Sequence, residues 1–297
     1  MSDAKTWLLV LLTLLSVAFA CAWFAWWRRP QTTDEYGTVP GPPTGATLAI
    51  GAATNFFDTL GVGSFAPSTA LFRWLGLVPD RLIPGTLNVG HALPSVAQAL
   101  IFIAIVQVES RTLTAMILAA VLGAWLGAGM VAGWSRRRVQ AGMGVALLVA
   151  AALLVRQVAL GDPAGADALG LRGATFWIGV AGNFVLGALM TLGVGLYAPC
   201  MLLVTLIGLN AKAAFPIMMG SCAFLMPAAG ARFILRRAYA PPVALGLTLG
   251  GIPAVLVAAY VVRSLPLDAI RVLVVIVAVY TALTMLRSAQ RESASAD

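Results

Sequence analysis

Long apolar runs alternate with short polar segments along nearly the whole chain. A membrane-spanning helix needs about 20 apolar residues, and most of the runs have that length. The pattern predicts an all-α integral membrane protein without a separate soluble domain. The apolar runs cover residues 7–27, 44–77, 81–108, 111–134, 139–160, 173–209, 212–235, 242–262 and 265–286.

Two of these runs, 44–77 and 173–209, are longer than 30 residues and carry glycine and proline near their middle. The first contains "FFDTLGVGSFAPSTALF", from Phe56 to Phe72, and the second contains "TLGVGLYAPCMLL", from Thr191 to Leu203. An ordinary spanning helix avoids Gly-x-Gly and Pro in its interior, because both weaken the helix. Each long run is therefore predicted to be a broken or re-entrant helix pair.

The two long runs belong to an internal repeat. When residues 59–84 are aligned without gaps on residues 191–216, 11 of 26 positions are identical, including two glycines of each motif and the following proline. Interrupted segments at matching places in two halves indicate the binding site of a secondary transporter. The sequence predicts five regions: a leading helix and loop (1–43), a first repeat (44–160), a linker loop (161–172), a second repeat (173–286) and a polar tail (287–297).

Basic residues favour an inverted arrangement of the two repeats. If each long run crosses the membrane once, Lys and Arg divide 10 to 9 between the two sides. If each long run is re-entrant, they divide 12 to 7, and every basic cluster lies on the cytoplasmic side, as the positive-inside rule requires. We therefore expect seven full crossings and two re-entrant pairs, with an external N-terminus and a cytoplasmic tail.

Composition excludes several other classes of protein. The chain is 60% hydrophobic and 10% charged, whereas soluble domains are about 25% charged. The net charge of +8 does not indicate nucleic-acid binding, because the basic residues lie at the ends of apolar runs. With one histidine, and with Cys21, Cys200 and Cys222 inside apolar runs, neither a metal site nor a cofactor is expected. "AFAC" at 18–21 faintly resembles a lipoprotein cleavage box, but the apolar run continues beyond it, which favours a retained helix over a signal peptide.

The two motif regions resemble a known family. The segments "GVGSFAP…GLVPDRLIPGTLNVGHALP" and "GVGLYAPCMLLVTLIGLNAKAAFPIMMGS" are similar to the signature regions of the TauE/SafE sulfite-exporter-like permeases. The resemblance covers about residues 44–286. It implies secondary transport of sulfite or an organosulfonate across the cell membrane, usually export and in some relatives import. It also implies that the glycine motifs of the two halves meet near the middle of the protein.

The motifs suit a small anion. A helix N-terminus offers free N–H groups and a partial positive charge, and glycine lets the backbone approach a ligand. Proline is tolerated in the first turn of a helix, so "SFAP" and "LYAP" are expected to start new half-helices. The alternative is that the glycines only permit close helix packing. The expected substrate-binding residues of the motifs are Gly61, Gly63, Ser64, Gly193, Gly195 and Tyr197, supported by Pro67 and Pro199.

A polar stripe follows the first motif. Asn88, His91, Ser95 and Gln98 are spaced three, four and three residues apart, so they share one helical face. In a membrane such a face turns toward the protein interior or a wet cavity. Asn88 and His91 are therefore candidates for substrate binding, and Ser95 and Gln98 for support. Packing alone is the alternative for His91.

Asp58 is an acidic residue in an apolar run, and Met190 stands at the matching position of the second half. Asp58 and His91 are the candidates for binding a coupled proton or cation, whereas pairing with Arg81 would give Asp58 a structural role. Asn55, Thr59 and Thr191 are polar neighbours with supporting roles.

A membrane enzyme and a channel are the competing interpretations. The sequence contains no HExxH, no GxSxG and no paired acidic motif. Channels usually repeat a pore loop through several subunits, whereas two broken segments in one chain favour alternating access. A small-anion transporter surrounded by lipid is the interpretation that we favour.

Overall fold

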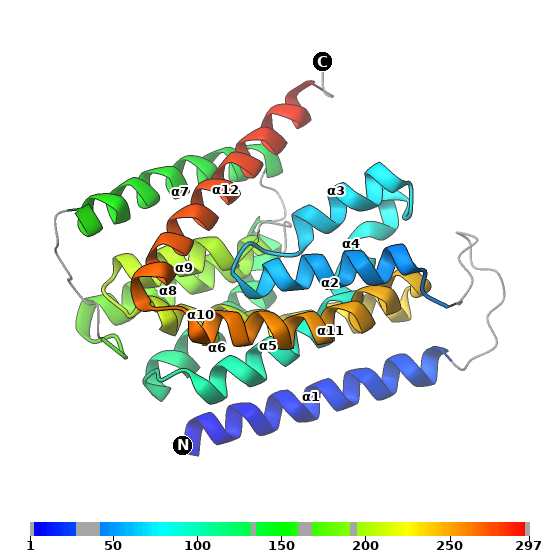
Figure 1. Cartoon of the computed structure of the whole chain (residues 1–297), viewed down its shortest axis with the longest axis horizontal. Coiled ribbons are helices and arrows are strands. Elements are labelled where there is room, and N and C mark those ends of the chain that lie inside the picture. The colour runs from blue at the N-terminus through cyan, green and yellow to red at the C-terminus, as the bar shows by residue number, and fades with distance from the viewer. Residues whose placement is uncertain (1–2, 28–41, 132–134, 160–167, 191–194, 295–297) are drawn as a thin grey trace. The chain divides into compact units, whose positions relative to one another are not determined.

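The computed structural model describes residues 3–27, 42–131, 135–159, 168–190 and 195–294 (Figure 1). All regular elements in these ranges are helices, which agrees with the predicted all-α class. The helices are α1 (Asp3–Trp27), α2 (Gly45–Thr59), α3 (Phe65–Leu75), η1 (Asp80–Leu82), α4 (Ile83–Gly90), α5 (Ala92–Ile105), α6 (Ser110–Val131), α7 (Arg136–Ala159), α8 (Gly173–Met190), α9 (Tyr197–Leu206), η2 (Ala211–Ala213), α10 (Ala214–Leu235), α11 (Pro241–Ser264) and α12 (Leu267–Ala294).

Seven helices in the described part of the chain are long and apolar enough to cross a membrane. The chain is therefore a multi-pass membrane protein. Six of the seven coincide with predicted crossings and the seventh is α8, while the predicted crossing 111–134 corresponds to α6, of 22 residues. Helix length does not decide whether α8 crosses or re-enters, so the re-entrant topology stays a prediction.

The first long run is broken where its glycines lie. Helix α2 ends at Thr59 and α3 begins at Phe65. Between them, Gly61 has a φ of +98° and Gly63 a φ of +86°, in the left-handed region where a side chain is strained. In the second long run α8 ends at Met190 and α9 begins at Tyr197, which is 132 residues after the start of α3.

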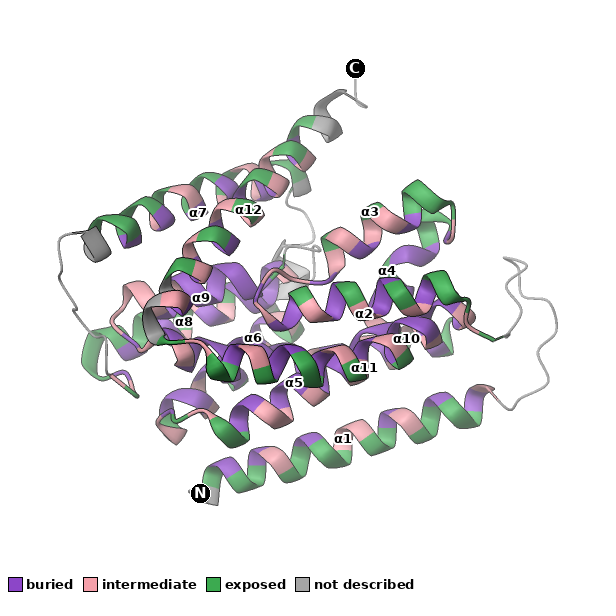
Figure 2. Cartoon of the chain, viewed as in Figure 1, coloured by how far each residue is buried: buried purple, intermediate pink, exposed green. Residues whose placement is uncertain are grey.

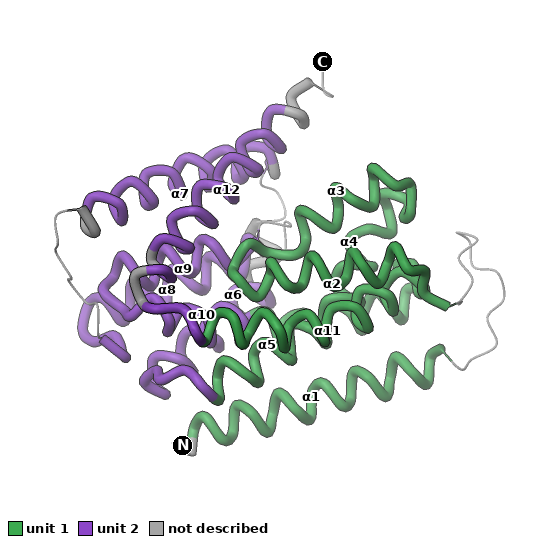
Figure 3. The backbone as a smooth tube through the Cα atoms, viewed as in Figure 1, with its two compact units in different colours: residues 1, 3–104, 222–263 green, residues 2, 105–221, 264–297 purple. Residues whose placement is uncertain are grey.

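The chain divides into two compact units (Figure 3). Unit 1 contains residues 3–104 and 222–263, and unit 2 contains residues 105–221 and 264–297. Each unit combines helices from both halves of the sequence, and the boundary falls within α10. The boundaries of the predicted repeats are therefore not the boundaries of the compact units.

In unit 1 the glycine-rich helix α11 packs directly against the backbone of α2. A Cβ at Gly51 would lie 2.7 Å from the Leu247 Cα, and a Cβ at Gly246 would lie 2.6 Å from the Thr47 Cβ. A Cβ at Gly250 would overlap the Leu48 carbonyl oxygen. Small residues thus bring two helix backbones together, which is a common source of helix association in membranes.

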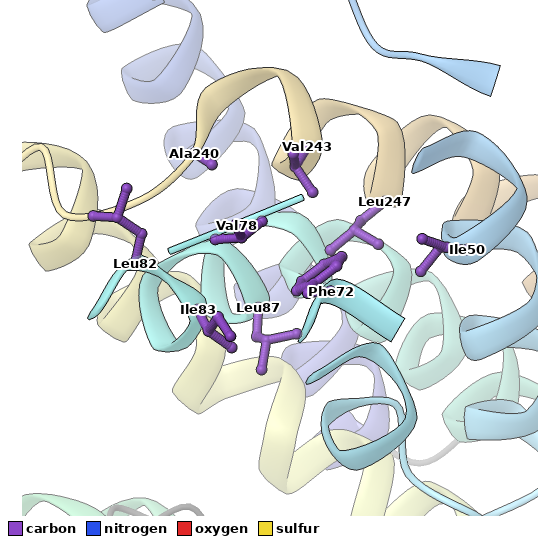
Figure 4. Packing of buried hydrophobic residues seen from close by; sticks show 9 residues of the cluster. All are labelled: Ile50, Phe72, Val78, Leu82, Ile83, Leu87, Ala240, Val243 and Leu247. Atoms are coloured by element: carbon purple, nitrogen blue, oxygen red, sulfur yellow. The ribbon is translucent and has the colours of Figure 1, made fainter. Parts of the chain in front are cut away.

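Apolar side chains from several helices fill the rest of unit 1 (Figure 4). Phe72 of α3 is fully buried and lies among Leu87 of α4, Ile50 of α2 and Leu247 of α11. This cluster fixes the second half of the broken run against the first. Its members are Ile50, Phe72, Val78, Leu82, Ile83, Leu87, Ala240, Val243 and Leu247.

The leading helix α1 belongs to unit 1. Its Trp23 donates a hydrogen bond from Nε1 to the hydroxyl of buried Tyr239, at 3.1 Å. Its Phe19 ring packs against Gly230 of α10, so that an added Cβ at Gly230 would lie 3.0 Å from the ring. These contacts attach α1 to α10 and to the segment that precedes α11.

Unit 2 uses the same kind of helix packing. Gly187 of α8 lies against the Ala120 backbone of α6, where a Cβ would come within 2.7 Å of the Cα. Gly123 of α6 lies equally close to the Phe184 backbone of α8. The glycine-rich helix of each half therefore packs on the first helix of the other half's broken run.

Large apolar side chains remain exposed on several helices (Figure 2). Trp7 of α1, Trp125 of α6 and Trp177 of α8 are between 66% and 71% exposed. Exposed apolar surface of this extent is unfavourable in water but suits contact with lipid acyl chains.

Alanine at Gly250 is expected to destabilise the protein by about 1–3 kcal/mol or more, because the added methyl group forces α2 and α11 apart. Gly142 of α7 is the matched control, since a Cβ there meets no atom within 4 Å. Gly142→Ala should be neutral or stabilising by up to about 1 kcal/mol, as expected within a helix. Thermal unfolding of the purified variants measures both effects, and equal stability of the two variants would contradict the described contact.

Candidate functional site

A buried hydrogen-bonded network in unit 1 is centred on His91. Its Nδ1 lies 3.0 Å from Asn55 Oδ1, and its Nε2 lies 3.0 Å from Ser68 Oγ. Asn55 Nδ2 donates to the carbonyl oxygens of Gly51, at 2.8 Å, and Leu247, at 3.5 Å, which directs Oδ1 toward the imidazole. Because an amide oxygen only accepts, Nδ1 carries a proton, and in the neutral imidazole Nε2 then accepts from the Ser68 hydroxyl. The network therefore uses both ring nitrogens.

A helix interruption places His91 in this network. The predicted continuous crossing from residue 81 is divided into α4 and α5, and His91 lies between them. Pro94 has no N–H to donate to the carbonyl oxygen of Gly90 four residues earlier. The hydroxyl of Thr248 on α11 donates to that oxygen instead, at 2.8 Å. The interruption is thus stabilised by a side chain from the second half of the sequence.

A second network surrounds Asp58, which is 3% exposed. Gln98 Nε2 donates to Asp58 Oδ2 at 2.9 Å and to Thr59 Oγ1 at 3.0 Å. The backbone N–H and the hydroxyl of Ser64 also interact with the Asp58 carboxylate. Arg81 is exposed, and the described ion pairs are Arg73 with Asp80 and Arg172 with Glu109. The alternative of a structural Asp58–Arg81 pair therefore has no support among the described contacts.

The two networks meet at Asn55. Thr59 Oγ1 accepts from Gln98 and donates to the Asn55 carbonyl oxygen at 2.8 Å, while the Asn55 side chain bonds His91. The side chains of Asn55, Thr59, Ser68, His91 and Gln98 have no exposed surface. Buried polar groups that are fully paired in this way specify one arrangement, and removing a partner is costly.

The start of α3 lies beside Asp58 and the glycine turn. Ser64 occupies the N-cap position of α3, but its hydroxyl makes no capping hydrogen bond to the helix. The hydroxyl interacts with Asp58 instead. Pro67 occupies the first turn, where its missing N–H costs no helical hydrogen bond. A Cβ at Gly63 meets no atom within 4 Å, so the glycine here borders open space.

The other residues of the polar stripe have separate partners. Asn88 is half-buried, and its Nδ2 donates to the Pro84 carbonyl oxygen of its own helix at 2.8 Å. Ser95 Oγ lies 3.3 Å from the sulfur of Met226 on α10. Of the four stripe residues, His91 and Gln98 therefore join the polar residues of α2, whereas Asn88 and Ser95 do not.

The second motif is described in part. Thr191 and Gly193 lie outside the described residues. Gly195 is exposed, and a Cβ there would meet no atom within 4 Å. Tyr197 and Pro199 are buried in the first turn of α9.

Unit 2 contains a smaller polar cluster, and sequence reasoning did not identify it. Asn183 of α8 donates from Nδ2 to the Met116 carbonyl oxygen at 2.7 Å and to Ser221 Oγ at 3.2 Å. Its buried Oδ1 has no hydrogen-bond partner. The cluster has no ionisable residue, so the equivalent regions of the two halves differ in charge. Ser68 was also missed, although its position four residues after Ser64 would place both on one face of α3.

Comparison with known proteins adds the family. The model of the family described as "Sulfite exporter TauE/SafE" matches residues 1–154, which is just over half of the 297 residues. The chain belongs to the TauE/SafE sulfite exporter family. The match includes the leading helix, which the sequence resemblance left out, and ends before the second motif. No curated protein and no solved structure matches the chain.

Membership of the TauE/SafE family makes the chain a membrane transport protein of the permease type, with a small sulfur-containing anion as the implied substrate class. The matched region contains the whole Asp58 and His91 network except Leu247. No group of three or more metal-binding side chains occurs among the described residues. The Asp58 and His91 network therefore consists of neutral hydrogen-bonding groups, one carboxylate and one imidazole.

Proposed function

We propose that this chain exports sulfite or a small organosulfonate across the cell membrane by alternating access, with the glycine-containing breaks as substrate-binding segments. The family match supports the substrate class, and the helices long enough to cross a membrane support the location. Direction follows the gradients across the membrane, so import by the same protein is the alternative.

One observation carries the choice of the first break as a binding segment. The backbone N–H and the hydroxyl of Ser64, at the start of α3, already interact with a carboxylate, that of Asp58. This segment therefore has the donors and the helix terminus that an anionic oxygen group requires. Gly61 and Gly63 keep the turn free of side chains, and Gly63 borders open space.

The remaining binding residues of the proposal are Asn88 and His91 of the first half and Gly193, Gly195 and Tyr197 of the second half. Asp58 and His91 stay the candidates for a coupled proton or cation. A channel would conduct without saturation, and a membrane enzyme would alter the anion, so both differ from a transporter in a flux experiment.

Purified protein in liposomes is expected to carry labelled sulfite or methanesulfonate in a saturable manner, because alternating access binds one substrate in each cycle. The measurement is counterflow of the labelled anion in both directions, with protein-free liposomes as the control. Chemical analysis of the anion after transport tests for an enzyme. Saturable flux of a cation or a sugar, without flux of either sulfur anion, would contradict the proposed substrate class.

A further inference from the structure

The Asp58 carboxylate is surrounded by hydrogen-bond donors. Gln98 donates through Nε2, and the backbone N–H and the hydroxyl of Ser64 interact with the carboxylate. Gln98 cannot turn its oxygen toward Asp58 without losing its other hydrogen bond, because its Nε2 also donates to Thr59 Oγ1. The Thr59 hydroxyl is in turn committed to the Asn55 carbonyl oxygen.

This environment favours a proton over a metal cation as the partner of Asp58. A bound cation requires several oxygens with lone pairs directed at it. Gln98 and Ser64 direct hydrogens at the carboxylate instead, and no group of metal-binding side chains was found among the described residues. A proton fits, because it binds a carboxylate oxygen directly and the Ser64 hydroxyl can rotate to accept from it.

The same donors are those proposed to bind the substrate. Each N–H or O–H group donates one strong hydrogen bond, so the Ser64 groups cannot serve Asp58 and a second anion together. Two negative charges near one another in a buried site also repel strongly. The ionised carboxylate of Asp58 therefore occupies the position of an anionic ligand at the start of α3.

We propose that Asp58 is the proton-binding group of this transporter, and that its ionised carboxylate competes with the substrate anion for the donors of Ser64. One proton therefore binds with each anion, and the two cross the membrane in the same direction, so export proceeds where the outward gradient of the anion exceeds any inward gradient of protons. This inference rests on the proposed transport of a sulfur anion. For a singly charged sulfonate the cycle is electrically neutral, so the membrane potential does not drive it.

Other titratable groups on the surrounding helices are engaged elsewhere. His91 bonds Asn55 and Ser68, both neutral. Arg73 of α3 pairs with Asp80 of η1 at 2.9 Å, and both side chains are exposed. Arg81 is exposed, and Arg232 and Arg263 lie in the last turns of α10 and α11. None of these residues has a described contact with Asp58.

The test is binding of methanesulfonate to the purified full-length protein between pH 5 and pH 8, by calorimetry in two buffers of different ionisation enthalpy. Methanesulfonate stays ionised over this pH range, whereas sulfite changes its own protonation state, which would add to the measured proton uptake. We expect affinity to fall as the pH rises, by up to about tenfold per pH unit where Asp58 is ionised in the free protein, with uptake of up to one proton per anion there, because binding is linked to protonation of one group. Asp58→Asn should bind with an affinity independent of pH and without proton uptake. Asp80→Asn, which changes an exposed carboxylate in the same unit, should behave as the unmodified protein.

Two outcomes overturn the inference in distinguishable ways. Binding of methanesulfonate that is independent of pH and takes up no proton overturns the coupling and leaves the proposed function standing. If neither methanesulfonate nor sulfite binds at any pH, the proposed function is overturned, and so is the proposed competition between Asp58 and the anion. Because proton uptake is measured on the unmodified protein, the result does not depend on correct folding of Asp58→Asn. Infrared difference spectra then assign the proton, since the carbonyl band of a protonated carboxyl must vanish in Asp58→Asn.

Discussion

Replacement of Gly195 by valine is expected to weaken sulfonate binding by about 100-fold or more while the protein remains folded. An added Cβ at Gly195 meets no described atom within 4 Å, so the folded structure has room for the side chain. If the glycine turn brings N–H groups to the anion, valine prevents that approach. Loss of two charge-assisted hydrogen bonds, each worth about 1.5–3 kcal/mol, accounts for the expected factor.

A second variant, at Gly63, is expected to lose stability as well as binding. Its φ of +86° strains any side chain, so Gly63→Ala should lose about 1–2 kcal/mol of stability together with binding. Gly142→Ala is the control for both variants, because Gly142 is an open helical position outside the motifs. The measurements are calorimetric affinity for methanesulfonate and thermal unfolding of monodisperse samples. Unchanged affinity in both motif variants would show that the glycines serve packing and that the anion binds elsewhere.

Local signals in the sequence were sufficient to predict the broken run. Two glycines and a proline within an apolar segment marked the turn between α2 and α3, and α3 begins within the predicted "SFAP". The polar stripe was predicted as one face of one helix, but the helix is interrupted at His91. Pro94 was the available signal, since it leaves the Gly90 carbonyl oxygen without its helical donor.

The pattern of apolar and small residues in the sequence did not predict which helices contact one another. The glycines of α6 and α11 are visible in the sequence, but a glycine pattern does not specify which helix will pack against it. That α11 lies on α2, and α6 on α8, depends on the fit of complete surfaces. The partner of Asp58 was missed for the same reason, because Gln98 is 40 residues away and was recognised only as a member of the stripe.

The described structure adds a structural role to the binding role proposed for His91. From the sequence, His91 was a candidate donor to the anion. In the structure its nitrogens are used by Asn55 and Ser68, and all three side chains are fully buried. Its removal therefore affects the stability of the protein before it affects binding.

His91→Ala is expected to destabilise the protein by about 3–6 kcal/mol, a large part of the 5–15 kcal/mol typical of folded proteins. The change leaves Asn55 Oδ1 and Ser68 Oγ buried without partners, at about 1–3 kcal/mol each, and adds a cavity. His91→Gln is the matched variant, because a glutamine oxygen can accept from Ser68 while its nitrogen donates to Asn55. The double variant Ser68→Ala with His91→Ala should lose less than the sum of the single changes, because the Ser68 hydroxyl is then absent rather than unpaired.

Unfolding of four variants, His91→Ala, His91→Gln, Ser68→Ala and the double variant, measures the loss of stability caused by each change. The methanesulfonate affinity of His91→Gln then shows whether His91 also binds the anion. A positioning role in the network predicts that His91→Gln retains both stability and affinity. Direct donation to the anion predicts instead that His91→Gln retains stability but binds methanesulfonate about 10-fold or more weakly, which is the value of one charge-assisted hydrogen bond. His91→Ala with unchanged stability would contradict the network itself, since two fully buried polar groups cannot lose their partner without cost.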